Sequence, residues 1–303
     1  MLDISLLGTG GMIPLYNRYL TAMLARYNGH MLLIDCGEGT QVTMRELGWG
    51  FVGLDFILIT HFHADHISGI PGLLLSLSNY GKTKTLTIVG PQGVENVVNS
   101  LRVIAPELMY PIEFIELSFD NESPINLKLG DFHISALPLK HTLPCIGYSI
   151  NIPRIGKFDA ERAKEQGIPL ELWSRLQNGE AACGFTPDMV LGPDRKGIKV
   201  SYITDTRPID TIPGFIRDSD LFICEGMYGD DEMKQRADRF YHMIFSDAAR
   251  LAKFGTVKEL WLTHYSQAFS DPEKSIAAIS GIFENSKAGQ DRMSKSFLFS
   301  KSG

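Results

Sequence analysis

The chain has no uninterrupted apolar run long enough to span a bilayer, and its start, Met1 to Ser5, lacks the basic and apolar regions of a signal peptide. Its four cysteines are scattered, with no CxxC pair. This pattern argues against a disulfide framework and predicts reduced, mostly buried thiols in a cytoplasmic protein. The formal net charge is −6, which argues against a general polyanion binder. A local patch, or bound metal ions, could still create a nucleic-acid site.

The chain of 303 residues is 44% hydrophobic, so it can bury a large core, and no linker or low-complexity segment divides it. Expected strands outnumber expected helices and fall into two runs, each closed by helices. This pattern predicts an α/β fold, a single domain over residues 1–303 in which two sheets face each other and helices lie outside. One long helix is expected over Ile67–Ser78, and Ser246 is expected to cap another. Residues 153–199 are rich in Gly, Pro and charge and predict an inserted arm.

The segment Thr60–His66 carries the clearest chemical signal. It follows the apolar run Phe56–Ile59 and places three imidazoles and a carboxylate within six residues. Burying so many polar groups at the end of a core strand is costly unless they bind something. Residues two apart in an extended strand point the same way, so His61 and His63 can bind one ion. Neutral imidazole and carboxylate suit zinc and similar first-row metals, so the segment predicts half of a two-metal site.

Two ions need further protein ligands, which we expect at other strand ends. His264 and Asp205 each follow a buried strand that ends in threonine, and His141 follows a strand and precedes a Gly-Tyr turn. His133 lies within an alternating strand and is interpreted as structural or surface-exposed. The glycine-rich run at residues 8–11 lacks the spacing of a dinucleotide-binding loop and predicts a tight turn instead.

These segments resemble the metallo-β-lactamase superfamily, whose metal loop reads HxHxDH, and more narrowly the ribonuclease Z family of tRNA 3′-processing endonucleases. The narrower resemblance rests on segments in family order: Leu7–Gly11 with Pro14 and Asn17-Arg18, Asp35–Gln41, the metal loop, His141 with Gly147-Tyr148, Asp205–Pro208 and Leu262–Gln267. The arm region, Gly156–Pro169, also resembles the family. The resemblance therefore implies a four-layer αββα metallo-β-lactamase fold across nearly the whole chain.

The resemblance also implies the metal ligands and their grouping. One zinc ion would be held by His61, His63 and His141, and a second by Asp65, His66 and His264, with Asp205 bridging the two. Two such ions supply a metal-bound hydroxide that attacks the phosphate and compensate charge on the phosphate oxygens. Manganese or iron could replace zinc on these ligands.

Three residues are predicted to act in catalysis. Asp65 would orient or deprotonate the attacking water. By resemblance, Glu225 and His242 stand where the family has a Glu–His pair over the scissile phosphate, although their neighbours differ from the family pattern. We expect Glu225 to keep His242 protonated, so that His242 serves the leaving oxygen or the transition-state charge. The alternative is a simple buried Glu–His contact.

The substrate is less well defined by the sequence. The arm lacks the family's Gly-Pro element, since Leu170 and Glu171 follow Ile168-Pro169. It holds eight basic and seven acidic residues, which is a weak electrostatic clamp for RNA. Ala268-Phe269 also replaces the family's Arg-Tyr.

The first interpretation is a homodimeric tRNA 3′-trailer endonuclease that acts on precursor tRNA. The second is a phosphodiesterase or other small-molecule metallo-hydrolase of the same fold. The third is a non-catalytic binding module, against which the complete set of ligands argues.

Overall fold

The computed structural model describes residues 1–300 and contains two seven-stranded sheets. In spatial order the first consists of β14 (Ser294–Phe297), β1 (Leu2–Gly8), β2 (Ala22–Tyr27), β3 (His30–Ile34), β4 (Leu54–Leu58), β5 (Leu86–Pro91) and β6 (Ile112–Leu117). The second consists of β13 (Ser286–Ala288), β12 (Leu260–Thr263), β11 (Leu221–Glu225), β10 (Arg195–Ile203), β9 (Cys145–Arg154), β8 (Phe132–Leu139) and β7 (Ile125–Leu129). Both sheets are mixed, because each joins antiparallel strands to a parallel run, β3 to β6 in one and β10 to β13 in the other.

Most strands carry apolar residues on both faces: the inner faces of the two sheets pack against each other, and helices cover the outer faces. In β1, Leu2, Ile4 and Leu6 belong to the core between the sheets, whereas Leu7 belongs to the core beneath the helices. Strand β11 alternates in the same way, with Ile223 in the central core and Phe222 in the outer core of the second sheet. Strands that are buried on both faces need apolar residues at successive positions, and these strands have them.

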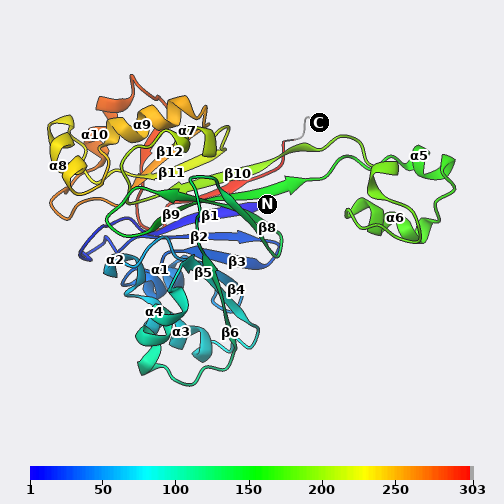
Figure 1. The fold of residues 1–303 in the computed structure, drawn as a ribbon, viewed down its shortest axis with the longest axis horizontal. Helices are drawn as coiled ribbons and strands as arrows, with labels where there is room; N and C mark the ends of the chain where they lie inside the picture. Colours follow the sequence, from blue (N-terminus) through cyan, green and yellow to red (C-terminus); the bar gives the residue numbers. More distant parts are fainter. Residues whose placement is uncertain (301–303) are drawn as a thin grey trace.

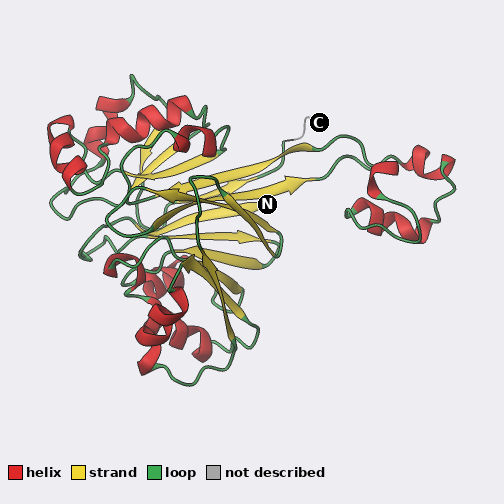
Figure 2. Ribbon diagram, viewed as in Figure 1, coloured by secondary structure: helices red, strands yellow, loops and turns green. Residues whose placement is uncertain are grey.

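Helices form the two outer layers (Figures 1 and 2). Those of the first sheet are α1 (Thr40–Leu47), α2 (Ala64–Ile67), α3 (Ile70–Asn79) and α4 (Val94–Leu101), followed by the 3₁₀ turn η1 (Arg102–Ile104). Those of the second sheet are α7 (Thr211–Phe215), α8 (Lys234–Arg239), α9 (Phe245–Phe254) and α10 (Glu273–Ile279). This αββα arrangement confirms the expected fold class. Within residues 1–300, no helix is both long enough and apolar enough to cross a membrane.

Two local predictions were wrong. The helix expected over Ile67–Ser78 is divided into α2 and α3, because Gly69 packs against the chain at Gly37. A Cβ on Gly69 would lie 2.2 Å from the carbonyl oxygen of Gly37, and the Gly69 N–H donates to the carbonyl oxygen of Cys36 at 2.8 Å instead of continuing the helix. Ser246 lies inside α9 rather than at its N-cap, which is Ile244. The backbone N–H of Ile244 donates to the carboxylate of Asp247 at 3.4 Å.

The segment between β9 and β10 leaves the body of the molecule. It carries α5 (Ala160–Glu165) and α6 (Leu170–Gln177) and projects well beyond the sheets (Figure 1). A separate small apolar cluster, which includes Ile168, Leu172 and Leu176, packs the projecting part against itself. The segment therefore does not cover the edge of the sheets where the strands β4, β10, β11 and β12 end.

A buried ion pair lies among α3, β4 and β5, away from that edge. The Lys82 side chain is fully buried, and its Nζ lies 3.2 Å from Oδ1 of Asp55. The other oxygen of Asp55 lies 2.6 Å from Nδ1 of His30. No other carboxylate of residues 1–300 pairs with Lys82, whose ammonium also lies 5.9 Å from the ring centre of Tyr110.

Replacing Asp55 by alanine is expected to lower the free energy of unfolding by about 3–5 kcal/mol, since Lys82 would keep a buried charge without a partner. Chemical denaturation measures this loss. The double variant Asp55→Ala/Lys82→Met removes both charges and should recover most of the stability.

Asp131→Ala is the matched control, because its carboxylate binds only the exposed Asn28 amide. It should change stability by less than about 0.5 kcal/mol. An Asp55→Ala variant as stable as this control would contradict the prediction.

Candidate metal centre

The candidate site lies where several strands of both sheets end. His61 and His63 follow β4, Asp65 and His66 lie in α2, and His141 lies in the turn between β8 and β9. Asp205 follows β10 and His264 follows β12. The structure thus brings all seven residues that the sequence nominated as ligands to one place, while His133 stays apart on β8. Their role as ligands stays a prediction.

Three strand-end residues of the site have left-handed backbone conformations. The φ angles are +59° at Asp35, +44° at Asp205 and +60° at His264. Such conformations are unfavourable for residues with a Cβ and concentrate at functional sites. Each one turns the chain sharply after a buried strand and directs the side chain to the common edge.

Six of the seven side chains form two groups of three. In the first group, Nε2 of His61 and Nε2 of His141 lie 3.0 Å and 3.2 Å from Nδ1 of His63. In the second group, Nε2 of His264 lies 3.2 Å from Nε2 of His66 and 3.3 Å from Oδ2 of Asp65. In each of the contacts between imidazoles, two ring nitrogens face each other, and at most one proton can lie between them. The remaining lone pairs face a shared space, which is the environment of a cation.

The Asp205 carboxylate lies between the two groups. Its Oδ1 is 3.2 Å from Nε2 of both His66 and His264, and its Oδ2 is 3.7 Å from Nε2 of both His61 and His141. Although burial opposes ionisation of Asp205, the neighbouring histidines hold its pKa well below the ordinary value. One carboxylate with an oxygen directed at each group is the geometry that a bridging ligand requires.

Burial keeps the imidazoles of the first group neutral. It lowers the pKa of His61, His63 and His141, and neutral imidazole is the form that binds metal. Burial raises the pKa of Asp65, but a hydrogen bond with His264 and the charge of His66 outweigh this effect, so the pKa is lowered. The first group therefore presents neutral nitrogens beside ionised carboxylates, a donor set that fits divalent metal ions. At His66 burial opposes protonation, but the carboxylates of Asp205 and Asp35 raise its pKa well above the ordinary value.

A second layer of contacts orients the ligands, and the sequence argument did not identify it. The Asp35 carboxylate lies 2.7 Å from Nδ1 of His66 and accepts hydrogen bonds from the backbone and hydroxyl of Thr60. The Thr60 hydroxyl also lies 3.0 Å from Nδ1 of His61. Such contacts fix the ring and leave the opposite nitrogen for the metal. The signal was present, since Asp35 follows a buried strand directly, as Asp205 does.

Glu225 and His242 meet at the edge of the metal cluster. Nδ1 of His242 lies 3.0 Å from Oε2 of the fully buried Glu225, whose other oxygen accepts a hydrogen bond from the backbone N–H of Thr206. Burial opposes protonation of His242, yet the Glu225 carboxylate raises its pKa to about 9. His242 is therefore protonated at neutral pH, with Nδ1 directed at Glu225.

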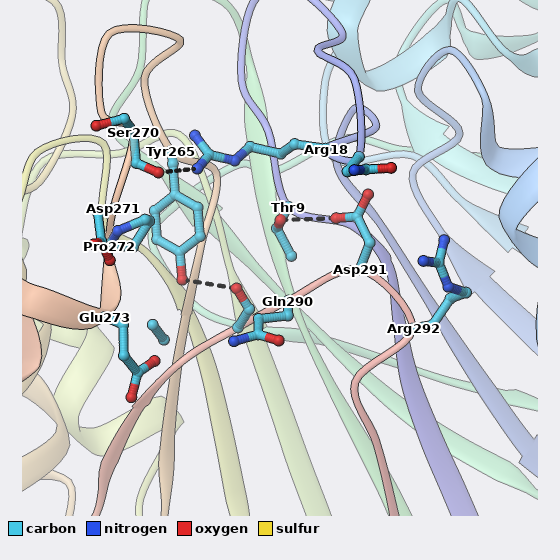
Figure 3. A pocket seen from close by; sticks show the side chains of 13 residues that line it. Thr9, Arg18, Tyr265, Ser270, Asp271, Pro272, Glu273, Gln290, Asp291 and Arg292 are labelled. Atoms are coloured by element: carbon cyan, nitrogen blue, oxygen red, sulfur yellow. Dashed lines mark hydrogen bonds between the residues drawn. The ribbon is translucent and has the colours of Figure 1, made fainter.

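A hollow of about 340 Å³ lies beside the site, and no histidine lines it (Figure 3). Arg18 crosses it and donates hydrogen bonds to the carbonyl oxygens of Phe269 and Ser270 at 2.7 Å and 3.2 Å. Its guanidinium lies 5.5 Å from the ring centre of Tyr265, the residue after His264. On the other side, the Thr9 hydroxyl donates to Asp291 at 2.8 Å. These contacts stabilise the backbone segment that carries His264 and Tyr265.

Comparisons with known proteins agree with this geometry. A family model described as "Anti-Pycsar protein Apyc1" matches residues 2–152, a range that includes the metal loop and His141 but neither Asp205 nor His264. A ribonuclease Z of Lachnoclostridium phytofermentans is 51% identical over 305 residues, which cover 99% of this chain and 99% of that protein. The chain belongs to the ribonuclease Z family. A second ribonuclease Z, from Clostridium acetobutylicum, is 50% identical over 306 residues and covers 99% of both chains.

Solved structures support the fold. The short form of human tRNase Z has a TM-score of 0.71 with 23% identity and covers 98% of this chain and 100% of its own. The YhfI protein of Bacillus subtilis, described as a metallo-β-lactamase fold protein, has a TM-score of 0.68 with 20% identity, covering 97% and 98%. Membership in the ribonuclease Z family, together with the His/Asp cluster, indicates that the chain binds divalent metal.

Proposed function

We propose that this chain is a metal-dependent endoribonuclease that removes the 3′ trailer of precursor tRNA. The observation that carries the proposal is the Asp205 carboxylate, whose two oxygens face two separate groups of ligand atoms. A pair of divalent ions is the arrangement that hydrolyses phosphodiesters at neutral pH. The full-length identity of about half to curated ribonuclease Z proteins supports RNA as the substrate.

The proposed ligands follow the two groups. His61, His63 and His141 would hold one ion, Asp65, His66 and His264 the other, and Asp205 both. The histidine-rich set favours two Zn²⁺, and Mn²⁺ or Fe²⁺ would also be accepted. When bound, the ions lower the pKa of water and neutralise charge that builds on the phosphate oxygens.

The protein's own groups then position the reaction. Asp65 is held by the backbone N–H of Met12, which donates to its Oδ2 at 2.8 Å, and is placed to orient the attacking water. His242, protonated because of Glu225, is placed to donate a proton to the ribose oxygen that leaves. Phosphodiester hydrolysis then balances: water supplies the oxygen on phosphorus and gives up a proton to Asp65, and His242 supplies the proton on the leaving oxygen.

The projecting arm supports a macromolecular substrate. An arm folded over the cleft would favour a small ester, because it would exclude a large one. The segment with α5 and α6 instead extends away from the body of the molecule (Figure 1). None of its residues lines the cleft at the metal cluster. We propose that it docks the body of the tRNA through contacts that do not depend on a strong net charge.

We further propose a cytoplasmic homodimer. Exposed apolar side chains in one short segment, Val103, Ile104 and Met109, are 75%, 68% and 67% exposed and would suit a contact with a second copy. Light scattering should give twice the chain mass of 33.7 kDa. A mass of one chain at micromolar concentration would contradict this proposal.

The test of the function compares a 3′-extended precursor tRNA with bis-p-nitrophenyl phosphate, using the wild type and His63→Ala in added zinc or manganese. We expect the wild type to remove the trailer and the variant to lose this activity. Cleavage of the small ester alone would keep the metal mechanism but reject tRNA as the substrate. In that case the protein is a phosphodiesterase of the same fold.

A further inference from the structure

One guanidinium enters the cleft that contains the metal cluster. The cleft has a volume of about 440 Å³, and besides the cluster and His242 its lining is largely apolar, with Met12, Ile13, Met227 and Phe240. Arg236, from α8, is the one arginine or lysine of residues 1–300 that lines it. The other titratable side chains on its walls are Asp65, Asp205 and the histidines.

Arg236 is held in place but has no charged partner. Its Nε donates to the Tyr228 hydroxyl at 3.2 Å, and its guanidinium lies 5.7 Å from the ring centre of Phe240. Within the described part of the chain, no carboxylate lies within ion-pairing distance of Arg236, and its two terminal nitrogens make no hydrogen bond. The terminal nitrogens are therefore available to a ligand.

Neighbouring cations are already paired. Arg207 lies 3.2 Å from Asp238, and Lys234 lies 2.7 Å from Asp247. His242 is engaged by Glu225 at 3.0 Å. An anion that enters the cleft beside the metal cluster thus meets a single free guanidinium.

We propose that Arg236 binds a phosphate of the RNA strand next to the scissile phosphodiester. This inference rests on the proposed function and names a binding residue for it. A planar guanidinium can donate two parallel hydrogen bonds to one phosphate. A chain with a formal charge of −6 and two carboxylates in its cleft needs such a local cation to accept a polyanion there. The hydroxyl of Tyr228 and the ring of Phe240 orient the guanidinium.

The experiment measures trailer cleavage by Arg236→Gln at several salt concentrations. Loss of one charge-assisted contact should raise KM for the precursor about tenfold, with a change in kcat of less than about twofold. The plot of log(kcat/KM) against log[salt] should become less steep by about 0.7 to 1, because one phosphate contact fewer is made. Arg236→Lys keeps the charge and should restore most of the salt dependence.

Arg239→Gln is the matched control. Arg239 lies on the same helix and over the same Phe240 ring, at 5.5 Å, but does not line the cleft. It should keep the wild-type KM and salt dependence. Equal KM values and equal salt slopes for the two glutamine variants would overturn the role of Arg236.

A wrong proposed function and a wrong role for Arg236 give different experimental results. A wild type that hydrolyses bis-p-nitrophenyl phosphate but no precursor tRNA would reject RNA as the substrate and, with it, this role of Arg236. A wild type that cleaves RNA, with Arg236→Gln indistinguishable from Arg239→Gln, would reject only the inference.

Discussion

Asp205→Ala should lower kcat/KM for trailer cleavage by at least about 1,000-fold, because the effect of each ion on the transition state amounts to several kcal/mol. Asp205 is the proposed bridging residue, since its Oδ1 faces the second group and its Oδ2 faces the first. The variant should also purify with less metal, which elemental analysis measures. By comparison, His63→Ala removes a ligand of only one group.

The control for Asp205→Ala is Asp218→Ala. Asp218 also has a left-handed backbone, with φ of +57°, but its side chain contacts Thr256 on the surface. Both variants place alanine in an unfavourable conformation, so the control measures the effect of the backbone alone. Full metal content and activity in Asp205→Ala would contradict the bridging role, whereas losses shared by both variants would point to folding.

His242→Ala should lower kcat for RNA by about 100- to 10,000-fold, the usual contribution of a general acid. The reason is that a ribose oxygen leaves as a poor, strongly basic anion unless it is protonated. Glu225→Gln keeps the histidine but removes the charge that raises its pKa to about 9, so it should cause a smaller loss. Single-turnover cleavage of precursor tRNA measures both effects.

Bis-p-nitrophenyl phosphate separates two roles of His242. Its leaving group departs as a stable anion and needs no proton, so His242→Ala should impair its hydrolysis far less than RNA cleavage. Equal losses on both substrates would show that His242 acts on the phosphate charge instead of the leaving oxygen. Metal content equal to that of the wild type is the check that the cluster remains intact.

Some parts of the fold could be predicted from local pattern alone. The apolar runs Phe56–Ile59 and Leu260–Leu262 are bounded by polar residues, and both fall largely within strands, β4 and β12. The division of the helix after the metal loop could not be predicted in this way. It depends on contact between Gly69 and Gly37, which are far apart in sequence, and no local propensity encodes that contact.

In the candidate site, too, some residues could be predicted from local sequence and others could not. His61, His63, Asp65 and His66 are clustered in sequence, so their residue types alone indicated a metal. His141, Asp205 and His264 were nominated because each follows a strand, and the resemblance to a family assigned their partners. Arg236 carried no such signal, since an arginine on a short polar helix is ordinarily a solvated surface residue.

The sequence by itself determined the residue types of the candidate ligands, the positions of several of them after strands and the family to which the chain belongs. Only the tertiary structure decided which oxygen of Asp205 faces which group, that Asp35 orients His66, and that Arg236 enters the cleft. The physical reason is that residue types and strand ends are local properties of the chain. Distances between side chains from different strands are set by the packing of two sheets and the sharp turns that follow them.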